Sequence, residues 1–296
     1  MTKVKGNMVG CSIITVVFGG GTTMISGNIL HVAKEEVTEA ECREIAETVR
    51  GDNSHLSTML ISIAAVPPVG AHMESVSVAW LAERQAEQQR LAKKARLLEA
   101  QLEGKLPQYT VEEVYTESFH IDNIVGHAAT LVDLMLIGQS VVSDPGTLNA
   151  VLDGALFHAR VPALISADAA MRLEQSTVQV AWADTPEAAT AVKASVPILK
   201  KAKSVQIVSV DLADDDRTSV SALHNYLSYH GVNSSAETIE SRGLTIAESL
   251  TAYADRIGSD LIVMGAYGHS RLRETVFGGV TRSMIDQPKR AIFLAR

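Results

Sequence analysis

The chain has 296 residues, of which 46% are hydrophobic and 20% charged, a balance that supports buried cores and excludes a disordered chain. Its net charge of −8 argues against a dedicated nucleic-acid-binding protein, because phosphate contacts require many Lys and Arg side chains. Two cysteines, Cys11 and Cys42, are too few for a disulfide framework. Apolar runs stay shorter than the roughly 18 residues of a membrane span, so we expect a cytoplasmic protein without one.

Strands and helices alternate along the first half of the sequence. Short apolar or alternating runs predict strands at residues 12–18, 56–64, 109–115, 133–138 and 162–166, with helices around 41–49, over 73–104 and over 123–131. Residues 19–39 separate the first predicted strand from the first predicted helix. We interpret them as an insertion for which the sequence predicts no secondary structure. A phosphate-binding loop at Gly19–Gly21 is not favoured, because neither GxxxxGK[ST] nor GxGxxG follows.

The same order then begins again. Strands are predicted at 177–183, 205–212, 234–240, 260–265 and 290–295, and helices at 186–202, 220–230 and 245–257. The run DLMLIG at Asp133 matches DLIVMG at Asp260, which indicates an internal duplication. Alternating strands and helices favour mainly parallel sheets. We therefore predict an α/β fold of two tandem domains, residues 1–168 and 175–296, joined by a short linker.

A glycine-rich segment directly follows the strand at 260–265. In an open α/β sheet, ligands bind at the carboxyl ends of the strands. Gly265 and Gly268 allow close approach of the backbone, and Gly278 and Gly279 lead into a helical pattern. A glycine turn that feeds a helix can hold a phosphate through backbone N–H groups. Further polar or cationic groups nearby are His269, Ser270, Arg271, Arg273 and Thr281.

The spacing Gly265-x2-Gly268-x9-Gly278 resembles the G-x2-G-x9-G pattern of nucleotide-binding universal stress proteins. That family continues with Ser or Thr, where this chain has Gly279, and Thr281 is the nearest hydroxyl that could replace it. The resemblance implies Rossmann-like, adenine nucleotide alpha hydrolase-like domains with five-stranded sheets. It also implies ATP or another adenine nucleotide as ligand, alone or with Mg²⁺.

Carried over by position, the resemblance also implies contacts to the nucleoside. The family's Asp at the end of the first strand corresponds to Ala183, so Asp184 would have to reach the ligand instead. Thr185 stands where the family often has Ser, and Val210 where an apolar residue touches adenine. The expected nucleotide-binding residues are Asp184, Thr185, Val210, Met264, Gly265, Gly268, His269, Arg271, Gly278, Gly279, Val280 and Thr281.

The first half has lost this motif. After DLMLIG only Gly138 stands at a motif position, and Asp144 and Asp153 would repel a phosphate in the absence of a metal. We therefore expect the first half to be a copy that does not bind nucleotide. No metal site is predicted, because the acidic run Asp214–Asp216 is typical of a solvated loop.

Two functions remain open at this point. The first is an adenine-nucleotide-binding stress-response or signalling protein with its site in the second half. Because no GxSxG, HExxH or CxxC pattern occurs, no enzyme class is assigned beyond slow ATP hydrolysis at most. The alternative is an interaction or scaffold module of the same fold, favoured by Ala183 and Gly279. Family members pair through sheet edges, which implies a homodimer or a pseudo-dimer within the chain.

Overall fold

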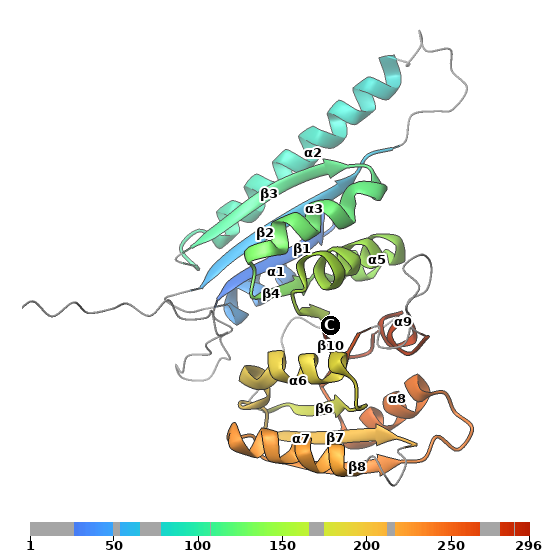
Figure 1. Ribbon diagram of the computed structural model, residues 1–296. Helices are drawn as coiled ribbons and strands as arrows, with labels where there is room; N and C mark the ends of the chain where they lie inside the picture. The colour runs from blue at the N-terminus through green and yellow to red at the C-terminus, as the bar shows by residue number, and fades with distance from the viewer. Residues whose placement is uncertain are drawn as a thin grey trace, which may run out of the picture.

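The structure is a computed structural model that describes residues 27–49, 54–65, 78–106, 108–165, 175–211, 217–266, 279–286 and 288–296. The described strands form one ten-stranded sheet with helices on both faces. Figure 1 shows the two halves end to end along this sheet, the first in blue to green and the second in yellow to red.

The first half supplies five strands with their helices. The strands are β1 (Asn28–Lys34), β2 (His55–Ile63), β3 (Tyr109–Thr116), β4 (Leu134–Ile137) and β5 (Ala163–Ile165). The helices are α1 (Glu39–Thr48), α2 (Val78–Leu102), α3 (Ile121–Ala128), α4 (Gln139–Val142) and α5 (Pro145–Asp153). Short 3-10 turns at Ser118–His120 and Ala129–Leu131 flank α3, and a π-helical turn at Gly154–Ala159 extends α5.

The second half repeats the pattern of alternating strands and helices. Its strands are β6 (Thr177–Ala181), β7 (Ser204–Val210), β8 (Ser234–Ile239), β9 (Leu261–Gly265) and β10 (Ala291–Ala295). Its helices are α6 (Pro186–Leu199), α7 (Arg217–Tyr229), α8 (Ile246–Ile257) and α9 (Gly279–Ile285).

The strand order is β3-β2-β1-β4-β5-β10-β9-β6-β7-β8, so each half has the same internal order. All neighbours are parallel except β5 and β10, which pair antiparallel through Ile165–Ile292, Leu164–Phe293 and Ala163–Leu294. This junction merges the halves into one continuous ten-stranded sheet, whereas the resemblance implied a five-stranded sheet in each domain. The hydrophobic pattern within a strand does not indicate which other strand will pair with it in the sheet.

Matching aspartates begin the matching strands of the two halves. The Asp133 carboxylate accepts a hydrogen bond from the Asn28 backbone N–H at 2.8 Å, and the Asp260 carboxylate accepts one from Thr177 N–H at the same distance. Each aspartate therefore fixes the start of β4 or β9 against the neighbouring β1 or β6. This shared role explains why DLMLIG and DLIVMG are so alike.

The core lies on both faces of the sheet. One face packs under α3, α5, α8 and α9, and includes Val125, Val151 and Leu250. The other packs under α1, α6 and α7, and includes Ala46 and Leu227. Burial on both faces is why the strands read as continuous apolar runs, as in parallel sheets generally. The predicted α/β class is confirmed.

The first strand that the structure describes was not predicted from the sequence. Residues 12–18 and Gly19–Gly21 lie outside the described residues, and β1 (Asn28–Lys34) occupies part of the segment interpreted as an insertion. Its sequence NILHVAK contains His31 and ends on Lys34, which interrupt the apolar run. The helix α5 was also missed, although Asp144 caps it and Pro145 begins it, a usual start signal.

Candidate functional site

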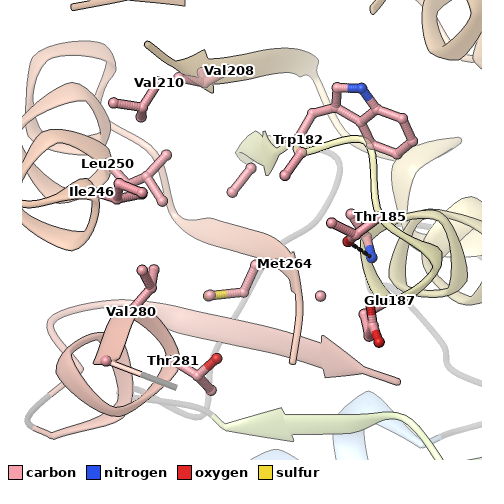
Figure 2. Close-up of a pocket in the computed structure, with 15 residues that line it drawn as sticks. Trp182, Thr185, Glu187, Val208, Val210, Ile246, Leu250, Met264, Val280 and Thr281 are labelled. Atoms are coloured by element: carbon pink, nitrogen blue, oxygen red, sulfur yellow. Dashed lines mark hydrogen bonds between the residues drawn. The ribbon is translucent and has the colours of Figure 1, made fainter. Parts of the chain in front are cut away.

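A cavity of about 250 Å³ lies at the carboxyl ends of β6, β7 and β9. The chain leaves β6 into α6 on one face of the sheet, whereas α9 packs with α8 on the other. This reversal between neighbouring strands opens a crevice, the usual ligand position in doubly wound sheets. Figure 2 shows the side chains that surround it.

The lining is mainly apolar and comes from both faces of the sheet. Figure 2 shows Val210, Ile246 and Leu250 on one side, Thr185 and Glu187 on the opposite side, and Met264 between them. The full lining is Ala181, Trp182, Ala183, Thr185, Glu187, Ala188, Val208, Val210, Ile246, Leu250, Met264, Gly265, Gly279, Val280 and Thr281. Such a cavity suits a flat apolar group attached to a polar one.

Local capping holds the β6–α6 side of the cavity. The Thr185 hydroxyl accepts a hydrogen bond from Ala188 N–H at 3.2 Å, and Pro186 supplies the first residue of α6. The Trp182 indole N–H donates to the Ser219 hydroxyl at 3.2 Å, which ties the ring to the first turns of α7. The wall of the cavity is thus fixed without a ligand.

Gly265 is required by a close approach of backbone to backbone. A Cβ at this position would lie 2.5 Å from the Ala188 nitrogen and 2.6 Å from the Glu187 carbonyl carbon. The start of α6 therefore rests directly on the end of β9, and any side chain at residue 265 would push the two apart.

Helix α9 supplies the remaining side of the cavity. Thr281 is buried, Val280 is half-buried, and a Cβ on Gly279 would meet no atom of the described residues within 4 Å. The Thr251 hydroxyl contacts the Met284 sulfur at 3.6 Å and joins α8 to α9.

Most of the sequence-predicted residues that the structure describes meet at this cavity. Asp184 does not, because it is exposed and absent from the lining. Gly268, His269, Arg271 and Gly278 lie outside the described residues. Those that line the cavity are Thr185, Val210, Met264, Gly265, Gly279, Val280 and Thr281.

Sequence reasoning missed several lining residues, above all Glu187 and Trp182. Glu187 lies in the first turn of α6, where acidic residues usually complement the helix dipole, so its position alone gave no signal. The signal available was topological, since the helix after β6 begins at the switch point. Apolar lining residues on α8, Ile246 and Leu250, also match an ordinary core pattern.

In the first half, the corresponding place is filled by the chain's own side chains. The Glu41 carboxylate accepts a hydrogen bond from Gln139 N–H at 3.1 Å and lies 3.4 Å from the Nε2 atom of His31. Both side chains are buried, and Glu41 covers Gly138 so closely that a Cβ there would clash with it.

An ion pair spans the same edge of the first half. The Lys34 ammonium lies 3.0 Å from the Asp144 carboxylate, which also accepts from Thr147. Burial alone would raise the pKa of Asp144, but hydrogen bonds from Lys34 and Thr147 outweigh it and hold that pKa below its ordinary value. Asp144 thus serves as an N-cap and ion-pair partner.

The described ranges contain neither a metal-binding cluster nor a membrane-spanning helix. No cluster of three or more His, Cys, Asp or Glu side chains there has an arrangement suited to a metal ion. Within the same ranges, the helices lack the length and apolarity needed to cross a membrane.

Comparisons with known proteins agree on the fold. No protein-family model and no curated protein matches the sequence. A universal stress protein structure from Archaeoglobus fulgidus DSM 4304 aligns at a TM-score of 0.61 and 13% identity, covering 90% of this chain and 98% of its own. A universal stress protein structure, described as putative in its name, from Pseudomonas aeruginosa UCBPP-PA14 aligns at 0.54 and 14%, covering 90% and 92%. This chain therefore has the fold of universal stress proteins.

Proposed function

We propose that the chain is a universal stress protein that binds an adenine nucleotide, such as ATP, in its second half. The observation that carries this proposal is the cavity at the switch point between β6 and β9, lined by Gly265, the first glycine of the motif, and by Gly279, Val280 and Thr281, which follow its last glycine. The fold and the motif spacing support it. We extend the proposal to a cytoplasmic signalling role in which binding, rather than fast turnover, is the activity.

The lining divides in a way that fits a nucleotide. Val208, Val210, Ile246 and Leu250 form an apolar wall suited to the flat base. On the remaining sides the polar groups fit a sugar and phosphates: Thr185, Thr281 and the backbone at Gly265 and Gly279. Bound nucleotide would supply the signal, with Mg²⁺ neutralising part of the phosphate charge.

The junction of β5 and β10 supports a further part of the proposal. Because the two halves already pair edge to edge, one chain forms the pseudo-dimer that two single-domain chains would otherwise form. Association of two such chains into a homodimer is a question for sedimentation or light scattering on the purified protein.

Nucleotide binding can be tested directly. Purified protein is denatured, released nucleotide is identified by mass spectrometry, and adenosine, AMP, ADP and ATP are titrated calorimetrically with and without Mg²⁺. We expect one nucleotide per chain. Ala188→Glu introduces a carboxylate at the cavity lining and should weaken binding by at least about 100-fold, because the charge opposes phosphate and fills space.

Thr190→Glu adds the same charge at an exposed position of α6 and is the matched control, expected to bind as the wild type does. Circular dichroism confirms that both variants fold, and Val280→Glu replaces Ala188→Glu if the latter does not. Unchanged affinity in a folded cavity variant contradicts the proposed site.

The interaction-module alternative rests on Ala183, which replaces the family's aspartate, and on the filled site of the first half. Absence of co-purified nucleotide, together with no heat signal and no thermal shift for any of the four ligands, would favour that alternative.

A further inference from the structure

Glu187 is the charged side chain among the lining residues that the structure describes. It is half-buried in the first turn of α6, and its main chain lies against Gly265 at the end of β9. Figure 2 places it across the cavity from Ile246 and Leu250. The carboxylate therefore stands at the polar side, opposite the apolar wall.

Within the described part of the chain, the Glu187 carboxylate has no hydrogen-bond or ion-pair partner. Other acidic groups of similar setting do have partners: Glu248, also in a first helical turn, accepts from the Thr245 backbone, and Asp144 pairs with Lys34. With respect to these described residues, Glu187 therefore acts neither as a helix cap nor as a member of an ion pair.

An ionised carboxylate only accepts hydrogen bonds, and it has two oxygens with which to do so. Near a phosphate it would be repulsive, whereas two neighbouring hydroxyl groups satisfy both oxygens. The ribose of a nucleotide carries such a pair, and it is attached directly to the base. With the base against Val210, Ile246 and Leu250, the sugar extends toward the polar side.

We propose that Glu187 determines the sugar specificity of this site by accepting hydrogen bonds from the 2′- and 3′-hydroxyls of a ribonucleotide. This inference rests on the proposed function and adds to it the class of ligand, a ribonucleotide rather than a deoxyribonucleotide. Glu187 does so from α6 rather than from the loop after β6, where the sequence resemblance placed Asp184. Asp184 is exposed and outside the cavity lining.

The test compares two ligands that differ only in one hydroxyl. Affinities of AMP and 2′-deoxy-AMP are measured by calorimetry for the wild type, Glu187→Gln and Glu187→Ala. We expect the wild type to prefer AMP by about 10-fold or more, the loss of one hydrogen bond to a charged group. Glu187→Ala should reduce this preference to about one, and Glu187→Gln should retain part of it.

The ratio of the two affinities is independent of the phosphate, because AMP and 2′-deoxy-AMP carry the same phosphate group. Asp184→Asn removes a charge from the adjacent loop without touching the lining and is the matched control, expected to keep the wild-type ratio. Circular dichroism and thermal melts verify that each variant is folded.

The outcomes separate this inference from the proposed function. Wild type that binds neither ligand, nor ADP or ATP, contradicts both. Binding without preference for AMP, or an unchanged preference in Glu187→Ala, overturns the role of Glu187 alone. If Glu187→Ala raises the affinity for AMP and for 2′-deoxy-AMP equally, Glu187 acts only as a charge that repels the phosphate, and the inference is wrong.

Discussion

The two halves share a backbone plan but differ at the carboxyl edge of the sheet. The third helical residues of α1 and α6, Glu41 and Ala188, each donate backbone N–H to a capping threonine. In the first half the Glu41 side chain fills the crevice, whereas in the second Ala188 leaves it open. Strand register also aligns His31 of the first half with Val180 of the second. A few side-chain exchanges on one frame therefore decide whether a cavity exists.

The largest expected difference between the halves is in the stability cost of substituting the paired glycines Gly265 and Gly138. In Gly265→Ala the new methyl group meets backbone atoms of α6, which cannot rotate away, so we expect a loss of about 2–3 kcal/mol in the free energy of unfolding. In Gly138→Ala the closest atom is the end of the flexible Glu41 side chain, and the loss should be smaller. Urea unfolding of both variants checks the order, and equal losses would show that the two contacts are equivalent.

Removing the Glu41 side chain, which fills the crevice of the first half, should have an effect of intermediate size on stability. Glu41→Ala deprives Gln139 N–H of its acceptor and should destabilise by about 1–2 kcal/mol, whereas Glu41→Gln keeps an acceptor and should cost less. Glu47→Ala, exposed on the same helix, is the control. We expect no second nucleotide to bind to Glu41→Ala, and a stoichiometry of two would contradict the assignment of the first half as inactive.

The Lys34–Asp144 pair offers the smallest effect and a pH signature. Because the pKa of Asp144 is lower when folded, its contribution is fully present above the unfolded value of about 3.8 and is lost as pH falls through the folded pKa. Asp144→Asn should therefore reduce stability at pH 7 by less than about 1 kcal/mol, since the pair is partly exposed. In thermal melts of both proteins at decreasing pH, the difference in stability should stay constant down to about pH 3.8 and shrink below it, and a difference that stays constant through the acidic range would exclude this origin.

The sequence predicted those features that local patterns encode. Apolar strands such as β9, the positions of helices α6 and α8, and the repeat around Asp133 and Asp260 follow from residues close together in the chain. The first strand was missed because His31 and Lys34 break its apolar run, although tertiary contacts bury His31 fully. Local sequence patterns also do not indicate which residues face each other across a crevice of the folded protein.

The candidate site shows the same limit. The seven described motif and strand-end residues were predicted because their types and spacing suit a ligand at a strand end. Glu187 was not, because a first-turn glutamate has a sufficient local explanation and only the packing of α6 on Gly265 places its residue at the cavity. Glu41, its near counterpart in the first half, was missed for the same reason.

The antiparallel seam between β5 and β10 has a consequence for synthesis of the chain. Strand β5 ends at Ile165, whereas its partner β10 begins at Ala291, so the first half emerges from the ribosome long before its edge can be covered. An uncovered edge invites pairing with other nascent chains, and a strand of only three residues is a poor template for it. The brevity of β5 thus protects the unfinished polypeptide until residues 291–295 arrive.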